Sequence, residues 1–236
     1  MPLIFKERDP SLIEWMDSPD CDQEKLFNTY RQFYTINKLL SGWSHLFEHY
    51  LKPTIEATNG SATILDIGCG GGDILKHLDT LCQKCGYNVQ LTGTDPDPRA
   101  QKFFEMNLEN RPIQFVKKTS HQLVENGASF DIVISNHLLH HLENNEVKSL
   151  CIDSEKLAKQ LVLFNDIERS DIGFGLFALS TPLLFRNSFI SADGKISIRR
   201  SFRKNELQQL LPEGWNVKRK FPFRLLAVHQ KEEIDG

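Results

Sequence analysis

The stretch that decides the fold is Thr63-Ile64-Leu65-Asp66-Ile67-Gly68-Cys69-Gly70-Gly71-Gly72-Asp73. It begins as an unbroken apolar run, which is typical of a strand that is buried on both faces of a parallel sheet. The run then becomes a glycine turn, and the apolar spacing that follows in residues 74–81 favours a helix. A strand, a glycine turn and a helix form the first half of a nucleotide-binding unit.

The charges on this turn indicate which nucleotide derivative it binds. A dinucleotide fingerprint would need a third glycine at position 73, where this chain has Asp73. Asp66 and Asp73 would repel a pyrophosphate at the helix N-terminus, but they would attract the ammonium and sulfonium of S-adenosylmethionine. The spacing Asp66-x-Gly68-x-Gly70-x-Gly72 is similar to that of the S-adenosylmethionine-binding loop of class I methyltransferases. A glycine turn without a ligand is the alternative.

The bulk composition limits the class of protein. With 236 residues, 40% of them hydrophobic and 25% charged, we expect one large α/β domain with an appendage. A net charge of −3 and a pI near 6.2 argue against a protein built to hold nucleic acid. Five irregularly placed cysteines suggest reduced thiols, and the lone Cys82-x-x-Cys85 pair suggests packing rather than a zinc site. A charged N-terminus and the lack of a ~20-residue apolar run predict a soluble, cytoplasmic protein without membrane contact.

An acid follows the next predicted strand, residues 89–94. Asp95 lies close to the spacing of ~20 residues beyond the glycines at which a ribose-binding carboxylate is expected. A carboxylate can accept hydrogen bonds from both ribose hydroxyls. Since Asp97 can cap the helix that opens at Pro98, Asp95 is predicted to bind the ribose. After the third strand, residues 113–116, related enzymes often have an acid for the adenine amino group, whereas this chain has Thr119 and Ser120.

The fourth strand, residues 130–136, runs directly into three histidines, His137, His140 and His141. Open parallel sheets bind ligands outside the carboxyl ends of their strands, so this turn should face the cofactor. At i, i+3 and i+4 on a helix the histidines could ligate a metal. No carboxylate stands at ligand spacing on the same turn, so we predict no metal and expect a proton-handling histidine, with plain packing as the alternative. Asp166 closes the fifth strand at the same edge of the sheet.

The flanking regions predict a cap and an insertion. Residues 10–58 read as helices, the first capped by Asp22 and the second stopped near Pro53. Polar groups such as Tyr30 and Tyr34 interrupt the apolar stripe, so residues 1–58 are either a lid or simply packed on the domain. Residues 171–200, with Pro182 as a breaker, would roof an acceptor pocket. Two basic clusters, in residues 199–204 and 218–224, are expected to be solvated, although they leave an anionic acceptor possible.

Over about residues 60–230 the chain resembles class I S-adenosylmethionine-dependent methyltransferases. It also looks like a narrower bacterial group that is associated with type III polyketide synthases and flavin monooxygenases. The segments that carry this second likeness are Asp17-Ser18-Pro19-Asp20-Cys21-Asp22, Ser135-Asn136-His137-Leu138-Leu139-His140-His141-Leu142, Asn165-Asp166-Ile167, Ser197-Ile198-Arg199-Arg200-Ser201-Phe202 and Phe221-Pro222-Phe223-Arg224-Leu225-Leu226. The likeness implies phenolic or polyketide-like acceptors.

The sequence thus predicts an α/β fold, a doubly wound seven-stranded Rossmann-like methyltransferase sheet with an antiparallel terminal strand. The helical cap covers residues 1–58 and the S-adenosylmethionine-binding domain residues 59–236. The expected activity is methyl transfer to a small molecule, with S-adenosylhomocysteine as the product. The alternatives are a methyltransferase for RNA or protein and a non-catalytic binding protein, and a monomer and a dimer both stay open.

Two sets of residues are predicted to serve this activity. The residues predicted to bind the cofactor are Asp66, Gly68, Cys69, Gly70, Gly72, Asp73, Asp95, Pro96, Thr119, Ser120, Asn136 and His137. The residues predicted to handle or orient the acceptor are His140 first, then His141, with Asp166 and Tyr34 as weaker candidates. A base that titrates near neutrality suits a phenol of pKa ~10.

Overall fold

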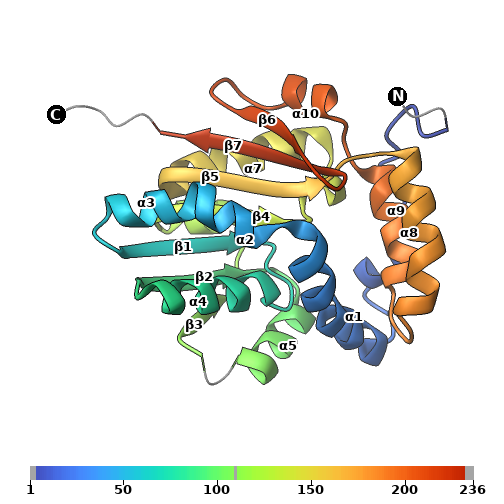
Figure 1. Ribbon diagram of the computed structural model, residues 1–236, viewed down its shortest axis with the longest axis horizontal. Coiled ribbons are helices and arrows are strands. Elements are labelled where there is room, and N and C mark those ends of the chain that lie inside the picture. The colour runs from blue at the N-terminus through green and yellow to red at the C-terminus, as the bar shows by residue number, and fades with distance from the viewer. Residues whose placement is uncertain (1–3, 109–110, 232–236) are drawn as a thin grey trace.

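The computed structural model describes residues 4–108 and 111–231, and in this part of the chain seven strands form one sheet (Figure 1). The strands are β1 (Ser61–Ile67), β2 (Asn88–Thr94), β3 (Ile113–Val116), β4 (Phe130–Asn136), β5 (Ala158–Ile167), β6 (Asn216–Lys220) and β7 (Arg224–Gln230). They lie in the order β3-β2-β1-β4-β5-β7-β6, and β7 runs antiparallel to both of its neighbours while the other pairs are parallel. The predicted doubly wound sheet with an antiparallel end is confirmed.

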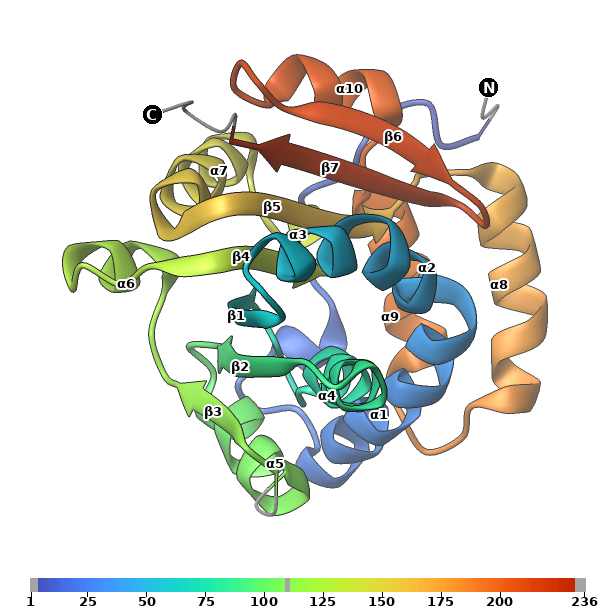
Figure 2. The same ribbon diagram turned by 60° about the vertical axis from the view of Figure 1, so that its left-hand side comes forward.

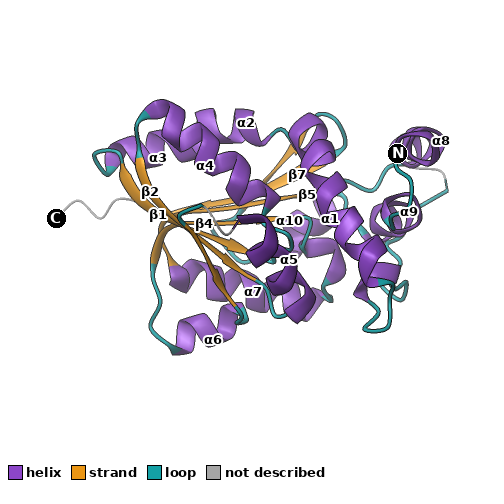
Figure 3. Cartoon of the chain, turned by 90° about the horizontal axis from the view of Figure 1, so that it is seen from below, coloured by secondary structure: helices purple, strands orange, loops and turns teal. Residues whose placement is uncertain are grey.

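Helices cover both faces of this sheet (Figure 3). They are α1 (Gln23–Ile36), α2 (Trp43–Leu46), α3 (Lys52–Ala57), α4 (Asp73–Cys85), α5 (Pro98–Leu108), α6 (Ser120–Glu125), α7 (Asn144–Leu157), α8 (Asp171–Leu184), α9 (Ile190–Arg200) and α10 (Lys204–Leu210). In β1, Ile64 packs in the core with α2, α3 and α4, while Leu65 packs in the core with α6, α7 and α10. Side chains alternate along a strand, so a strand covered on both faces is apolar at every position. This explains the unbroken apolar run that begins the deciding stretch.

The carboxyl ends of the parallel strands point toward α1, α8 and α9 (Figures 1 and 2). The strand order reverses between β1 and β4, and an open α/β sheet binds its ligands at such a switch point. The glycine turn after β1 and the histidine turn after β4 therefore meet at one place in the fold.

The predicted cap of residues 1–58 consists of two structurally different parts. The first helix, α1, begins where predicted, because the Asp22 carboxylate accepts a 2.9 Å hydrogen bond from the amide of Lys25. Tyr30 on α1 packs near the glycine turn, as a lid would. In α2 and the turn that follows it, Trp43 and Phe47 are instead buried in the main core against the sheet. Residues 43–57 are thus one layer of the domain rather than a cover.

Two prolines do not end helices as predicted. The chain passes through a π-turn, Phe47–Leu51, directly into α3, and Pro53 lies in the first turn of that helix. Proline is tolerated there because the first helical amides have no intrahelical acceptor. Pro182 lies inside α8 and the helix ends only two residues later, at Leu184, so few backbone hydrogen bonds depend on it. In the described part of the chain, no helix has the length and apolar character needed to cross a membrane.

Candidate active site

A cavity of about 400 Å³ lies at the carboxyl ends of β1, β2 and β4. Its walls come from the glycine turn, α1, the histidine turn, α8, α9 and residues 14–17 near the N-terminus. Most of the predicted site residues line this cavity, namely Asp66, Gly68, Cys69, Gly70, Asp73, Asp95, Pro96, Asn136, His137, His140 and His141. The structure therefore brings the predicted cofactor loop and the predicted proton-handling histidines into one space.

The glycine turn has a backbone that other residues rarely adopt. Gly68, Gly70 and Gly72 have φ angles of 71°, 49° and 75°. Gly68 and Gly70 line the cavity, whereas Gly72 does not, and a Cβ on Gly72 would lie 2.5 Å from the Phe104 ring. Gly72 therefore serves the turn and its packing rather than direct contact with a ligand.

Two carboxylates flank this turn, and one of them is buried with an unpartnered oxygen. Asp66 is 1% exposed, and its Oδ1 has no hydrogen-bond partner among the described residues. Burial, and then the charges of Asp73 and Asp95, raise the pKa of Asp66 well above its usual value. Asp73 accepts a 2.9 Å hydrogen bond from the Asn37 amide, and burial raises its pKa to about 6. Because an unpartnered buried carboxylate is costly, this end of the cavity fits a cationic ligand.

Asp95 lies beside the same turn, and backbone amides hold its carboxylate in place. Its Oδ2 accepts a hydrogen bond from the amide of Gly70 at 3.1 Å, and its Oδ1 accepts one from the amide of Asp97 at 2.9 Å. Burial raises its pKa. Asp97 in turn accepts from the amide of Arg99, as expected for the residue that caps α5. The carboxylate of Asp95 is thus oriented at the cavity wall, where its ribose role stays a prediction.

Besides Gly72, and Asp166, which lies behind His140, three predicted residues do not line this cavity. Thr119 caps α6, since its hydroxyl accepts from the amide of Gln122, and Ser120 donates to the Asp153 carboxylate at 2.9 Å. Tyr34 lies on the far side of α1, with the Lys76 ammonium 5.3 Å from its ring centre. Neither the adenine contact expected of Thr119 and Ser120 nor the acceptor contact expected of Tyr34 is supported by these positions.

The histidine turn is not the helix that the sequence suggested. His137 has a left-handed φ of 59°, which ends the strand abruptly, and only a short 3-10 turn, Leu139–His141, follows. His137 Nε2 lies 2.8 Å from Arg224 Nη1. Burial, and then the positive charge of Arg224, lower the pKa of His137 well below its usual value. His137 is therefore a neutral, fixed side chain beside the cofactor end of the cavity.

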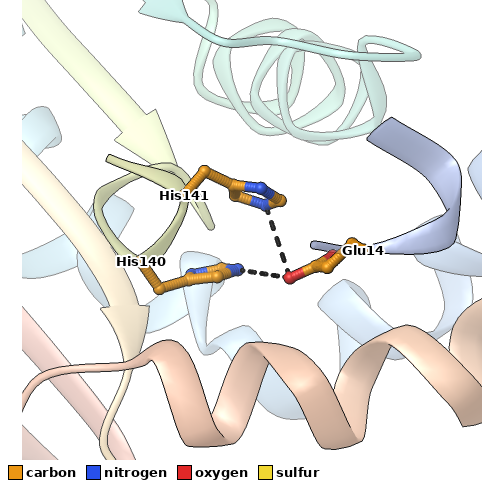
Figure 4. A group of neighbouring side chains, drawn as sticks. All are labelled: Glu14, His140 and His141. Atoms are coloured by element: carbon orange, nitrogen blue, oxygen red, sulfur yellow. Dashed lines mark ion pairs between the residues drawn. The ribbon is translucent and has the colours of Figure 1, made fainter. Parts of the chain in front are cut away.

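His140 lies between two carboxylates. It is 1% exposed, its Nδ1 lies 2.6 Å from Asp166 Oδ1, and its backbone amide donates to Asp166 Oδ2 at 2.9 Å. On the other side of the ring, His140 Nε2 lies 3.5 Å from Glu14 Oε1 (Figure 4). Burial alone would lower the pKa of His140, but Asp166 and then Glu14 raise it to about 9. Burial would raise the pKa of Asp166, yet the neighbouring His140 charge holds it far below its usual value.

His141 repeats this arrangement less tightly. Its Nδ1 lies 3.1 Å from Asp17 Oδ2, and its Nε2 lies 3.9 Å from Glu14 Oε1 (Figure 4). The ligand atoms of Glu14, His140 and His141 all lie within 4.8 Å of one another, as do those of His137, His140 and Asp166. We predicted no metal because no carboxylate stands at ligand spacing on the histidine turn itself. The fold brings the carboxylates of Glu14 and Asp166 to this turn from other elements. These two sets are the residues that could hold a cation here.

Three arginines hold the histidine turn in place, and two of them, Arg200 and Arg224, are buried. Arg200 donates from Nε to the carbonyl of His140 at 3.0 Å and from Nη2 to that of His141 at 2.6 Å. Arg8 donates from Nη2 to the same His140 carbonyl at 3.1 Å. Arg224 is likewise buried, with Nη2 donating to Asn136 Oδ1 at 2.9 Å. The expectation of solvated basic clusters is wrong for Arg200 and Arg224, because carbonyl and amide oxygens replace the water around them.

The residues that sequence analysis missed come chiefly from the segment before α1. Glu14 is 3% exposed and accepts a 2.7 Å hydrogen bond from Ser197 Oγ on α9. The segment is fixed by Asp193, which accepts from the amides of Trp15 and Met16 at 2.8 and 3.0 Å. No motif marks Glu14 in the sequence, since its place in the site depends on this long-range docking.

Comparisons with known proteins agree with this geometry. Residues 64–159 match a protein-family profile described as a methyltransferase domain. Among solved structures, the plantazolicin methyltransferase BamL in complex with a triazolic desmethylPZN analog and SAH is similar, with 19% identity over 91% of each chain and a TM-score of 0.62. The plantazolicin methyltransferase BpumL in complex with SAH has 14% identity, covers 92% of this chain and 93% of its own, and has a TM-score of 0.60.

A third structure, an O-methyltransferase family protein from Burkholderia thailandensis, has 14% identity, covers 90% of this chain and 60% of its own, and has a TM-score of 0.58. The search of curated proteins gave no match. At these identities the solved structures establish the fold, which this chain shares with methyltransferases. Residues 64–159 match a methyltransferase domain, so the activity indicated for the protein is methyl transfer.

Proposed function

We propose that the protein methylates a hydroxyl oxygen of a small molecule, with a phenolic or polyketide-like acceptor as first choice, and that His140 receives the acceptor's proton. One observation carries this proposal. The buried row Asp166–His140–Glu14 opens into the same cavity as the acid-flanked glycine turn. The phenolic class rests on the resemblance in sequence, and complexes of BamL and BpumL with desmethylPZN analogs support a small-molecule acceptor.

The residues around the cofactor have complementary roles in this proposal. Asp66 and Asp73 would face the cationic end of S-adenosylmethionine, because Asp66 Oδ1 has no partner among the described residues and burial raises the pKa of both carboxyl groups. Asp95 would accept the ribose hydroxyls, while Asn136 and His137 would line the sulfonium end. Trp43 and Arg224 hold the side chain of Asn136 by donating to its Oδ1 at 3.0 and 2.9 Å. These hydrogen bonds hold Asn136 in the position from which it would contact the methyl donor.

The chemical step needs mainly position and a proton acceptor. The methyl group of the sulfonium is already activated, so the acceptor oxygen forms a bond to it as the carbon–sulfur bond breaks, leaving S-adenosylhomocysteine. Holding the two reactants in line contributes most of the rate enhancement. The acceptor's proton would pass to His140 Nε2, the ring nitrogen on the side of Glu14, while Asp166 orients the ring through Nδ1.

The charge state of His140 makes the reaction depend on pH. With a pKa of about 9, the empty site holds an imidazolium at neutral pH, in contrast to the near-neutral titration expected from sequence. Only the neutral ring can accept a proton, so the rate should increase with pH toward about 9. A bound sulfonium carries a like charge and would lower this pKa toward physiological pH.

The test is methyl transfer by His140→Ala with His49→Ala as its matched control, since His49 is exposed on another helix. We expect the first change to lower kcat by ~10²–10⁴ while affinity for S-adenosylhomocysteine stays nearly constant. Near-wild-type turnover of His140→Ala would refute the assigned role. Label from S-adenosylmethionine that accumulates on RNA or protein rather than on small phenols would favour the macromolecular alternative, and tight cofactor binding with no turnover would favour a binding protein.

A further inference from the structure

The part of the cavity around His140 and His141, which we call the acceptor half, is lined by acidic side chains. Glu14 and Asp17 line it from the N-terminal segment, and Asp193 lines it from α9. Asp166 lies directly behind His140, 2.6 Å from its ring. Of the cavity-lining residues within 4–108 and 111–231, none is a lysine or an arginine. An anion that entered this space would meet these carboxylates first, and the His140 imidazolium on the cavity wall is already paired with Asp166 and Glu14.

The two cationic side chains next to the histidine turn, Arg200 and Arg8, do not line the cavity and already donate hydrogen bonds to backbone carbonyls. Arg200 uses Nε and Nη2 for the carbonyls of His140 and His141, and Nη1 for the carbonyl of Leu12. Arg8 donates to the carbonyls of Arg200, His140 and Leu142. Neither guanidinium could turn into the cavity without releasing the turn that carries His140. Arg200, one of the basic residues that left an anionic acceptor possible, is therefore structural.

The remaining wall of the acceptor half is apolar. Phe33 and Ile36 line it from α1, Phe177 from α8, Ile190 from α9 and Ile167 from the end of β5. Aromatic and aliphatic walls favour an uncharged aromatic or aliphatic body by burial of apolar surface. They also offer no hydrogen-bond donor that would offset the cost of removing a carboxylate or a phosphate from water.

We propose that this pocket excludes anions, so that the acceptors are uncharged or cationic compounds of apolar body that carry the reactive hydroxyl but no carboxylate, phosphate or sulfate. The inference rests on the proposed function and narrows its acceptor class. It also disfavours a phosphodiester polymer as acceptor, because every phosphate carries a negative charge. The selection follows from the side chains that touch the acceptor rather than from the net charge of the protein.

Three phenols that differ only in the group on a short side chain test the proposal: 4-ethylphenol, tyramine and 4-hydroxyphenylacetate. Methyl transfer from labelled S-adenosylmethionine is measured for each, and calorimetry measures binding of each to the protein saturated with S-adenosylhomocysteine. We expect the carboxylated compound to have a kcat/KM and an affinity about tenfold or more below those of the other two. Asp17→Asn should reduce this difference about threefold, whereas Asp20→Asn, an equal charge change at an exposed position outside the cavity, should leave it unchanged.

The two measurements separate failure of the inference from failure of the proposed function. The expected order in binding, without methyl transfer to any of the three, would refute phenol methylation and retain the anion-excluding pocket. Methyl transfer in which the carboxylated phenol is used as well as its neutral partner would refute the pocket and retain the reaction. A series in which neither the neutral nor the cationic phenol binds better than the carboxylated one, including a series in which none binds, overturns the inference.

Discussion

Glu14→Gln is the change that tests the site most directly. The Glu14 carboxylate faces His140 from the side of the ring opposite Asp166, and both groups are almost fully buried. Glutamine keeps the length of the side chain and retains an oxygen that can accept from Ser197 Oγ. The substitution therefore removes a charge and leaves the packing and one hydrogen bond in place.

The magnitude follows from the distance between the two groups. Two unit charges 3.5 Å apart, as in His140 Nε2 and Glu14 Oε1, attract by about 5 kcal/mol at an effective dielectric of ~20. At 1.36 kcal/mol per pH unit this sets an upper bound of about 3.5 pH units on the change in the pKa of His140. Asp166 remains to stabilise the imidazolium, so we expect a fall of about 1–2 pH units from a value near 9.

Two assays measure this fall. Nuclear magnetic resonance titration of labelled histidines gives the pKa of His140 without turnover, and the rising limb of the pH–rate profile gives it during catalysis. Asp17→Asn is the matched control, because Asp17 faces His141 at 3.1 Å and should leave the His140 titration nearly in place. A pKa of His140 that is the same in Glu14→Gln and wild type would refute the assignment of Glu14 to this row.

Three further outcomes are expected. Asp66→Asn should raise the melting temperature of the unliganded protein by about 2–4 °C per kcal/mol gained, because it removes an unpartnered buried charge. It should also weaken the binding of S-adenosylhomocysteine measured by calorimetry. A melting temperature and an affinity that both rise, or both fall, would contradict the cationic-ligand role. Asp95→Ala should weaken cofactor binding by ~1–3 kcal/mol, and unchanged affinity would remove it from the site. Because the pKa of His140 lies above its unfolded value of ~6.5, the stability that it contributes is complete below about pH 6.5 and is lost as the pH rises through about 9. Chemical denaturation across that range should show a smaller loss in Glu14→Gln, and equal losses would contradict the coupling.

The sheet could be predicted because its signals are local. The central parallel strands β1, β4 and β5 contain apolar runs that end at a polar residue or a glycine, and β4 was located to the residue, Phe130–Asn136. Glycines and acids at the strand ends then placed Asp66, Asp95 and His140 at one edge, since the carboxyl ends of parallel strands meet there. The cofactor half of the cavity followed from the same reasoning.

Local signals fail where the backbone or the solvent differs from the average. His137 adopts a left-handed φ, which is uncommon for a residue other than glycine, so the sequence did not reveal that the helix assumed in the metal alternative is absent from this turn. Arg200 and Arg224 stand in basic clusters, and only the folded chain supplies the oxygens that let them be buried. Pro53 and Pro182 resemble helix stops, yet their effect depends on where in a helix they fall.

The acceptor half could not be predicted because it inverts the usual relation between polarity and burial. In the segment Ile13-Glu14-Trp15, the two apolar side chains are 72% and 63% exposed, whereas the carboxylate between them is 3% exposed. From hydropathy alone we would expect Ile13 and Trp15 to be buried and Glu14 to be exposed. Folding tolerates the inversion because Ser197 and His140 compensate the buried carboxylate, and such local conflicts are expected at sites where function decides the residue. The exposed Ile13 and Trp15 are thus the counterpart of Glu14 facing His140, and the sequence indicates His140 and Asp166 without revealing Glu14, the second carboxylate beside the ring.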